Sequence, residues 1–172
     1  MKSKFVLLVI ILSSFLLPLG INGQTKEKKI ALSPYSRIIV KSNLRVVLIE
    51  NEKFDSARIE GSKKFLETVM ILQSGEDLII RAKSFKDLKK EGTIYVPVHD
   101  LRSLEVNSDA KVISYNAINS PQLNVLINGD CIVSLVVNGK LNINKAEGFE
   151  YVFHRVNYQS NTPVNLNYFI NY

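Results

Sequence analysis

Two aspartates at equivalent places of a repeat are the residues of this sequence that could do acid–base chemistry. Asp109 closes the unit Asn107-Ser108-Asp109, and Asp130 closes Asn128-Gly129-Asp130 at the equivalent place of the next unit. If the chain stacks coils at a strand spacing of about 5 Å, the two carboxyl groups fall within the range used by retaining glycosidases. Some polysaccharide lyases and hydrolases are built from stacked coils. The enzyme hypothesis for this chain is therefore a lyase or hydrolase that uses these two aspartates.

The same units are also what a tight bend requires. Asn, Asp and Gly are favoured in turns for their backbone geometry alone, and no outward Arg, Lys or His recurs beside the two aspartates. His99 and His154 each lack a partner at metal-ligand spacing. The dense Gly-Gly-x-Gly-x-Asp nonapeptide of calcium-binding repeats is not present either. The sequence therefore predicts no catalytic residue, no metal site and no cofactor.

An alternation of residue types from Leu123 to Ile143 indicates the elements that carry these units. Every odd position is apolar or small and the even positions are mostly polar, which is the period of extended strands with one buried face. The phase is kept through Gly129 and Gly139, whereas a two-residue hairpin would break it. We therefore expect the chain to bend without reversing, as in a parallel β-helix.

The spacing of the repeat is typical of a solenoid, in which each unit buries its apolar face against its neighbours. One circuit of about 21 residues at roughly 3.3 Å per residue encloses a perimeter of about 70 Å, enough for a dry core. Stacking is expected to place Asp109 beside Asp130 and Asn107 beside Asn128. With so few coils, the solenoid needs caps at both ends.

Shorter alternating runs precede the repeat. They predict strands within residues 35–50, with a bend at 41–43, and within residues 56–61, 78–81 and 94–98. The segment from Lys63 to Leu72 is ambiguous, because Phe65, Leu66, Val69 and Met70 would also suit one face of a helix. A turn followed by a strand is the favoured interpretation.

The segment from Met1 to Gly23 has the organisation of a signal peptide. Lys2 and Lys4 precede an apolar run, Pro18 ends it, and Gly23 offers a small residue for cleavage. The alternative is an uncleaved membrane anchor, which Pro18 and the serine pair make a poor span. We therefore expect an exported protein, located in the periplasm, on the outer-membrane surface or outside the cell.

Charge and cysteine content exclude further classes of protein. Removal of residues 1–23 lowers the net charge from +6 to +4, and the lysine clusters are not interleaved with aromatic residues as a nucleic-acid platform requires. Nucleic acid is therefore not an expected partner. Cys131 is the only cysteine, so no intramolecular disulfide can form. It takes the inward position equivalent to Ala110 and is expected to be a small core residue.

The order and spacing of several segments resemble a bacterial family of exported domains, the putative auto-transporter adhesin, head GIN domain. The segments that carry the resemblance are Ile38-Ile39-Val40, Leu44 to Leu48, Ala57 to Gly61, Asp77 to Ile80, Ile94 to Pro97, Leu101 to Val106 and the Asn128-Gly129-Asp130 coil. The resemblance implies a right-handed parallel β-helix in a cell-envelope or surface setting. None of these segments is a catalytic motif.

The mature chain, residues 24–172, is expected to be a single β-helix head domain. It would comprise N-terminal strands over 24–100, repeat coils over 101–144 and an aromatic cap over 145–172. Family members usually continue with Gly-rich coils, whereas here the last predicted strand alternates Val164, Leu166, Tyr168, Ile170 and Tyr172 with Asn165, Asn167 and Asn171. The alternative for this strand is an outer-membrane insertion signal, and too few long strands are present to close a barrel.

These observations predict an exported, non-enzymatic cell-envelope or surface protein, an adhesin or binding module without a membrane span after signal cleavage. Its polar outer face would bind a glycan or an envelope protein, or would serve only as a structural ladder. The residues of that face are Asn124, Asn128, Asn138, Asn142 and Asn144. The alternative function is a polysaccharide lyase or hydrolase that uses Asp109 and Asp130.

Overall fold

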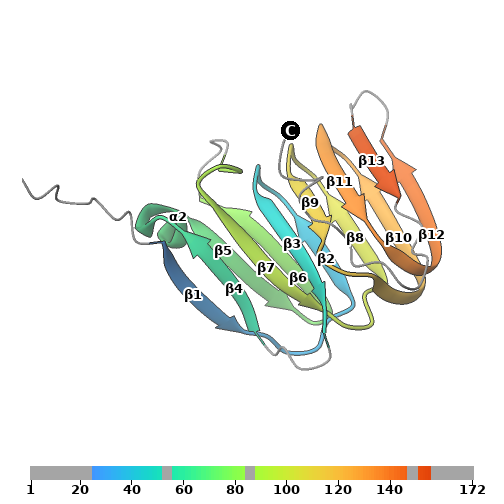
Figure 1. Cartoon of the computed structure of the whole chain (residues 1–172), viewed down its shortest axis with the longest axis horizontal. Coiled ribbons are helices and arrows are strands. Elements are labelled where there is room, and N and C mark those ends of the chain that lie inside the picture. Colours follow the sequence, from blue (N-terminus) through green and yellow to red (C-terminus); the bar gives the residue numbers. More distant parts are fainter. Residues whose placement is uncertain (1–24, 52–55, 84–87, 147–150, 156–172) are drawn as a thin grey trace, which may run out of the picture.

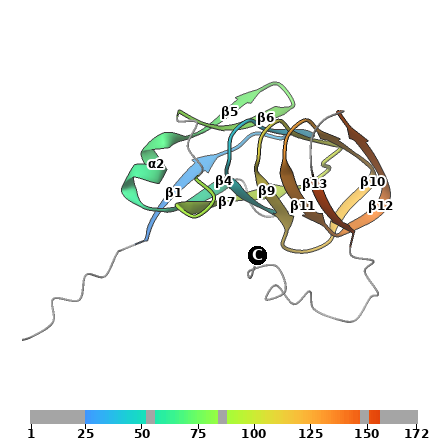
Figure 2. The same ribbon diagram turned by 90° about the horizontal axis from the view of Figure 1, so that it is seen from above.

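The computed structural model describes residues 25–51, 56–83, 88–146 and 151–155 of the chain. These residues form two mixed β-sheets that face each other, with a short helix at one end of the molecule (Figures 1 and 2). The prediction of an all-β chain is confirmed. The predicted signal peptide and most of the predicted aromatic cap lie outside the described residues.

Sheet A has seven strands and sheet B has six. In spatial order, sheet A consists of β1 (Lys26–Ala31), β4 (Ser56–Gly61), β7 (Gly92–Val98), β3 (Arg45–Glu50), β9 (Lys111–Ser114), β11 (Cys131–Leu135) and β13 (Tyr151–Arg155). Sheet B consists of β12 (Val137–Lys145), β10 (Ile118–Ile127), β8 (Ser103–Val106), β2 (Arg37–Val40), β6 (Asp77–Ala82) and β5 (Val69–Ser74). The helix is α2 (Lys63–Thr68).

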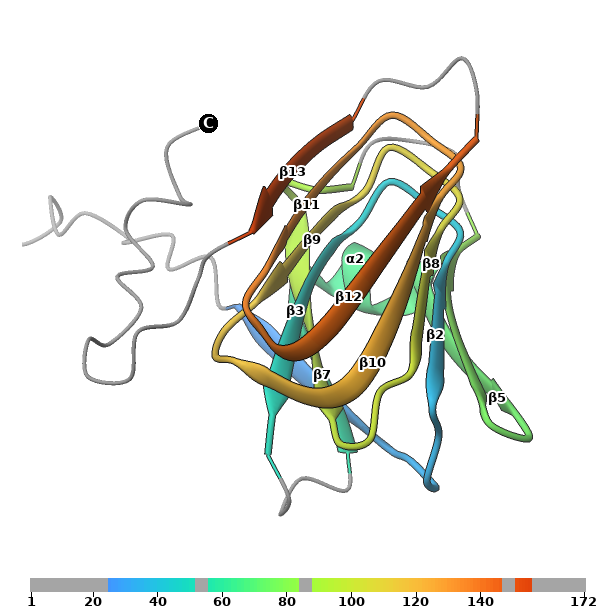
Figure 3. The same ribbon diagram turned by 90° about the vertical axis from the view of Figure 1, so that its right-hand side faces the viewer.

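Four successive strand pairs, β2–β3, β8–β9, β10–β11 and β12–β13, place one strand in each sheet and stack in parallel (Figure 3). Ser103 of β8 pairs with Asn124 of β10, and Lys111 of β9 pairs with Ile132 of β11. Both pairs have the offset that the repeat predicts. The bends between the paired strands nest one behind another in Figure 3, as stacking of the repeat requires.

The N-terminal half adds strands that run in both directions. β6 and β7 continue sheets B and A in parallel with β2 and β3, whereas β5 pairs antiparallel with β6, and β4 pairs antiparallel with both β7 and β1. A turn at Gly75, whose φ is +59°, reverses the chain between β5 and β6. Both sheets are thus wider than the stacked pairs alone.

Helix α2 corrects the expectation of a turn before the strand in residues 63–72. Ser62 caps the helix by accepting a hydrogen bond from the Phe65 amide at 3.2 Å, and the helix ends where Val69 becomes extended. Only the second half of the segment, β5, is a strand. Phe65 is 1% exposed and packs against Gly61 and Gly92, so the helix closes this end of the core.

The core lies between the two sheets and follows the predicted alternation. The fully buried residues of the stacked strands are Ile38, Val40, Val46, Leu48, Leu104, Val106, Val112, Ile118, Leu123, Val125, Ile127, Val133 and Leu135. Ala110, Gly129 and Cys131 are buried at the bends, as expected. The last strand of sheet B differs, since Ile143 is 39% exposed although it pairs with the fully buried Val125.

Candidate functional site

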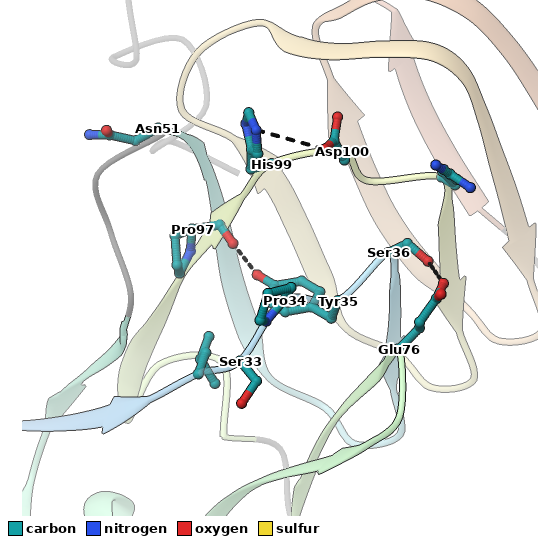
Figure 4. Close-up of a pocket in the computed structure, with 11 residues that line it drawn as sticks. Ser33, Pro34, Tyr35, Ser36, Asn51, Glu76, Pro97, His99 and Asp100 are labelled. Atoms are coloured by element: carbon teal, nitrogen blue, oxygen red, sulfur yellow. Dashed lines mark hydrogen bonds and ion pairs between the residues drawn. The ribbon is translucent and has the colours of Figure 1, made fainter.

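A pocket of about 360 Å³ lies at the end of the strands where the chain passes from β7 in sheet A to β8 in sheet B (Figure 4). Four segments build it: residues 32–36 before β2, the residue after β3, the β5–β6 turn, and residues 97–102, which run from the end of β7 to the start of β8. Its lining residues are Leu32, Ser33, Pro34, Tyr35, Ser36, Asn51, Glu76, Pro97, His99, Asp100 and Arg102.

Tyr35 forms part of the wall and is held in place by its hydroxyl group. The hydroxyl donates a hydrogen bond to the carbonyl oxygen of Pro97 (Figure 4). Burial raises the pKa of Tyr35 well above its usual value, so the phenol stays neutral and remains a donor. Tyr35 therefore joins the segment before β2 to the end of β7 and fixes the width of the pocket.

A second wall is tied to the β5–β6 hairpin through Gln73 and Glu76. The Gln73 side chain accepts a hydrogen bond from the Ser33 amide at 3.0 Å and donates to the Ser33 and Pro34 carbonyl oxygens at 2.8 and 3.3 Å. The Ser36 hydroxyl donates to Glu76 Oε2 at 2.5 Å. These bonds hold the segment before β2 in one conformation.

The opposite wall carries His99, Asp100 and Arg102. His99 Nδ1 lies 3.7 Å from Glu50 Oε1, and His99 Nε2 lies 3.7 Å from Asp100 Oδ2. Asp100 has a φ of 56°, in the left-handed region that few residues other than glycine adopt. The Arg102 amide donates to the Ser36 carbonyl at 2.8 Å, which anchors the backbone and leaves the side chain exposed.

This arrangement is suited to binding. Leu32, Pro34 and Pro97 supply apolar surface, while the rim offers hydroxyl, carboxylate, imidazole and guanidinium groups. The volume falls in the range of small-molecule sites, and the combination of apolar walls with a few convergent polar groups is typical of them. Non-glycine residues in the left-handed region are also enriched at such sites.

Asp109 and Asp130, the pair that the alternative lyase or hydrolase hypothesis would use, lie at the opposite ends of the strands. β2 begins beside the pocket and ends before the bend at residues 41–43, on which the bends that contain the two aspartates stack. The Asp109 amide donates to Asn43 Oδ1 at 3.2 Å, and Asn43 Nδ2 lies 3.5 Å from Asp109 Oδ2. Both aspartates are exposed, and the structure does not bring them to the pocket.

Three of the five asparagines predicted to form a binding face donate hydrogen bonds to asparagines of a neighbouring coil. Nδ2 of Asn128, Asn138 and Asn142 donates to Oδ1 of Asn107, Asn119 and Asn124, at 2.7, 3.0 and 2.9 Å respectively. Each bond joins neighbouring strands or bends of the stack. These amides therefore act as a ladder that stabilises the coils.

Sequence reasoning missed the pocket because its walls come from segments outside the repeat. In the sequence, His99 stands out only as a histidine without a metal partner, and Tyr35 only as the first residue of a strand region. The available signal was a pair of prolines in non-repeating segments, Pro34 directly before Tyr35 and Pro97 two residues before His99. Within the described ranges, no three His, Cys, Asp or Glu residues gather in a way that could hold a metal ion. No helix in those ranges is long and apolar enough to cross a membrane.

The model of one protein family, the putative auto-transporter adhesin, head GIN domain, matches residues 34–152. The chain belongs to this family. The matched part of this head GIN domain includes the stacked strand pairs up to the start of β13, and every residue that lines the pocket except Leu32 and Ser33. The expectation drawn from the order of its segments is thus confirmed.

Two crystal structures have folds similar to this head GIN domain. One is of a putative adhesin from Parabacteroides merdae, with a TM-score of 0.60 and 20% identity, and the match covers 77% of this chain and 57% of the other. The second is of a putative adhesin from Parabacteroides distasonis, with a TM-score of 0.61, 18% identity and the same coverage. This chain thus spans little more than half the length of either solved chain. No curated protein is significantly similar to it in sequence.

Proposed function

We propose that this head GIN domain is an exported, non-enzymatic, adhesin-like module that binds a glycan in the pocket beside Tyr35. The observation that carries the proposal is the construction of the pocket walls. Hydrogen bonds from Tyr35, Ser36 and Gln73 fix the backbone around a cavity of about 360 Å³. A site formed in advance loses less entropy on binding, which favours recognition of a ligand with many weak contacts.

The chemistry of the rim favours a polyhydroxylated ligand. Asp100 and Glu76 can accept hydrogen bonds from hydroxyl groups, and the Arg102 guanidinium and Ser33 hydroxyl can donate them. The apolar surface of Pro34 and Pro97 can pack against the C–H groups of a sugar ring. An envelope protein that inserts a polar side chain is the competing partner, and it would use the same donors and acceptors.

The asparagine face that the sequence suggested is a less favourable binding surface than the pocket. Three of its five amides, those of Asn128, Asn138 and Asn142, already donate along the stack. A ligand there would compete with bonds that stabilise the coils, whereas a ligand in the pocket would not. The pocket is therefore the site we assign to recognition.

The proposal also includes export of the protein and a β-helix architecture. We expect cleavage of the signal peptide after Gly23, so that residues 24–172 form one domain in the periplasm, on the outer-membrane surface or outside the cell. The parallel register between successive coils supports a right-handed parallel β-helix for this part of the chain. Residues 145–172 would cap its last coil. The intact mass of exported protein tests the cleavage, and retention of residues 5–17 would contradict it.

The binding proposal can be tested with a glycan array. The purified domain is screened together with Asp100→Gly and Arg102→Gln. Gly accepts a φ of 56° without strain, so Asp100→Gly removes the carboxylate while preserving or raising stability. Lys140→Gln, an exposed change in β12 far from the pocket, is the matched control.

We expect both pocket variants to lose at least tenfold in affinity for the glycans that the unaltered domain retains, and Lys140→Gln to bind normally. Equal binding by all four proteins would contradict the pocket assignment. Cleavage of a polysaccharide that disappears in the double variant Asp109→Asn, Asp130→Asn, with an unchanged circular dichroism spectrum, would contradict the non-enzymatic role and favour the lyase or hydrolase alternative.

A further inference from the structure

Three neighbouring backbone segments place a carboxylate, a hydroxyl and a guanidinium next to one another where sheet B borders the pocket. Glu76 directly precedes β6, Ser36 precedes β2 and Arg102 precedes β8, and these three strands are neighbours in sheet B. The Ser36 amide donates a hydrogen bond to the Glu76 carbonyl oxygen at 3.1 Å, and the Arg102 amide donates to the Ser36 carbonyl oxygen at 2.8 Å. Ser36 therefore separates the acidic residue from the basic one.

The backbone of Arg102 is held from both sides. Besides the bond to Ser36, its carbonyl oxygen accepts a hydrogen bond from the Asn124 amide at 2.9 Å. The preceding residue, Leu101, is fully buried in the core. The Arg102 side chain is exposed and lines the pocket, so a positive charge stands at the rim before any ligand arrives. Such positioning in advance lowers the entropy that binding costs.

The two carboxylates that line the pocket already have partners in the protein, and the guanidinium does not. Oε2 of Glu76 accepts the Ser36 hydroxyl at 2.5 Å, and Oδ2 of Asp100 lies 3.7 Å from Nε2 of His99 (Figure 4). Among the described residues, no carboxylate pairs with the Arg102 side chain. The charged group that the pocket leaves for a ligand is thus a cation.

We propose that Arg102 makes the pocket selective for acidic sugars by binding the carboxylate of a sugar acid. A guanidinium presents its N–H groups as a planar fork that matches the two oxygens of a carboxylate, and the two parallel hydrogen bonds fix the orientation of the sugar. The ring itself packs against the apolar part of the pocket. Arg102 then distinguishes the acid from the corresponding neutral sugar.

The other groups of the rim favour a sugar acid over an acidic peptide. Glu76 and Asp100 can accept hydrogen bonds from sugar hydroxyl groups. The same two carboxylates would repel a second negative charge placed close to the first. A ligand with one carboxylate among several hydroxyl groups therefore fits this rim better than a run of aspartate or glutamate residues does.

The inference rests on the glycan-binding role proposed above and specifies the class of glycan. Its test uses pairs of ligands that differ only in the acid group. Glucuronoxylan, oligogalacturonate and sialyllactose are each immobilised beside their carboxyl-reduced forms, in which a hydroxymethyl group replaces the carboxylate. Poly-glutamate is included as an acidic ligand without sugar.

The proteins compared are the unaltered domain, Arg102→Gln, Asp100→Gly and Arg81→Gln. Arg81→Gln is the matched control, because it removes the same charge from an exposed arginine of β6 that does not line the pocket. General electrostatic attraction of an acidic ligand would be weakened equally by both arginine variants. Each protein is first checked for an unchanged circular dichroism spectrum and Tm.

We expect the unaltered domain and Arg81→Gln to bind at least one acidic glycan at least tenfold more tightly than its carboxyl-reduced form. Arg102→Gln should bind the two forms of that glycan equally. Asp100→Gly should bind both forms more weakly than the unaltered domain and still prefer the acid, because Arg102 is intact. Poly-glutamate should bind at least tenfold more weakly than the preferred acidic glycan.

Three results would overturn the inference: equal binding of the acidic and reduced forms by the unaltered domain, an equal loss in Arg102→Gln and Arg81→Gln, or binding of poly-glutamate as tight as that of the acidic glycans. If reduced glycans bind as well as acidic ones and Asp100→Gly weakens both, only the preference for acids is wrong. If the unaltered domain retains none of the glycans, the proposed function fails together with the inference.

Discussion

The Asn128 side chain donates a hydrogen bond to Oδ1 of Asn107, one coil below, at 2.7 Å. The same two bends are in contact through their backbones, because a Cβ atom on Gly129 would stand 2.7 Å from the Ser108 nitrogen. A polar ladder on the outside and a close approach on the inside thus fix the stacking of these coils.

The ladder bond is expected to make a modest contribution to stability. Asn128→Ala should lower the free energy of unfolding by about 1 kcal/mol, the net value of a typical hydrogen bond, because Asn107 remains accessible enough to be hydrated. Urea denaturation measures the change. Asn144→Ala, at an exposed position of β12, serves as the control and should have a smaller effect. A decrease in the free energy of unfolding above about 3 kcal/mol would exceed the contribution of one hydrogen bond and would contradict this modest role.

Substitution of Gly129 should destabilise the fold far more than substitution of Asn128, because the two bends are in close backbone contact there. Gly129→Val forces a branched side chain against the Ser108 backbone, with an expected cost of about 3 kcal/mol or more. Gly75→Ala is the comparison, since nothing lies within 4 Å of its Cβ and only its φ of +59° is strained. That change should cost about 1 kcal/mol. Similar losses in the two variants, measured by urea denaturation, would contradict the stacking of the bends.

Cys131 should react slowly with thiol reagents in the folded protein. Burial, with smaller contributions from Asp109 and Asp130, raises the pKa of its thiol to about 11. The thiolate is the reactive form, and its fraction at pH 8 falls about a hundredfold relative to an ordinary cysteine. The rate of labelling with an aromatic disulfide, with and without urea, measures this difference. Rapid labelling of the native protein would show that the side chain does not point inward.

The same thiol predicts a loss of stability in alkali. Its pKa is higher in the folded than in the unfolded chain, so the unfolded chain loses its proton first as pH rises above about 8.5. The free energy of unfolding should therefore decrease between that pH and about 11. Cys131→Ala introduces the residue that the preceding coil has at the equivalent position, Ala110. This variant should show a smaller decrease in the free energy of unfolding over the same pH range. An unchanged alkaline slope in Cys131→Ala would assign the effect to other groups.

Glu105 should stabilise the fold at neutral pH and lose this effect in acid. A hydrogen bond from Asn107 at 2.6 Å, together with the Arg37 guanidinium, lowers the pKa of the Glu105 carboxyl group. A folded pKa below the unfolded value gives stability that is present above about pH 4.3 and is lost as pH falls through the folded pKa.

Glu105→Gln should accordingly cost about 1.5–3 kcal/mol at pH 7, the range for a hydrogen bond to a charged group. The difference from the unaltered protein should shrink as the pH falls below 4. Glu67→Gln, at an exposed position of α2, provides the reference and should show no such dependence. A constant difference from pH 7 to pH 3, by urea denaturation, would contradict the role of the ionised carboxylate.

The sequence was sufficient to predict most of the strands, the bend at residues 41–43 and the stacking of the repeat, because burial of one face leaves a period of two. Strand β1 was not predicted, because it is almost wholly exposed and has no such period. Helix α2 was not predicted, because so short a helix cannot establish a period of 3.6 and its apolar residues continue directly into β5. Asn128 and Asn107 were placed together correctly by the repeat. Tyr35 and Pro97 were not, because no period relates two contacting residues so far apart in the chain.

The pairing of β2 with β8 and of β3 with β9, across all the strands from β4 to β7, has a consequence for folding kinetics. The three later coils contact one another at short sequence separation and can propagate one from the next. The first coil can join them only after the intervening strands have been brought into place, at a larger cost in loop-closure entropy. Removal of residues 101–146 would leave the partner edges of β2 and β3 exposed, so the N-terminal half is not expected to fold alone.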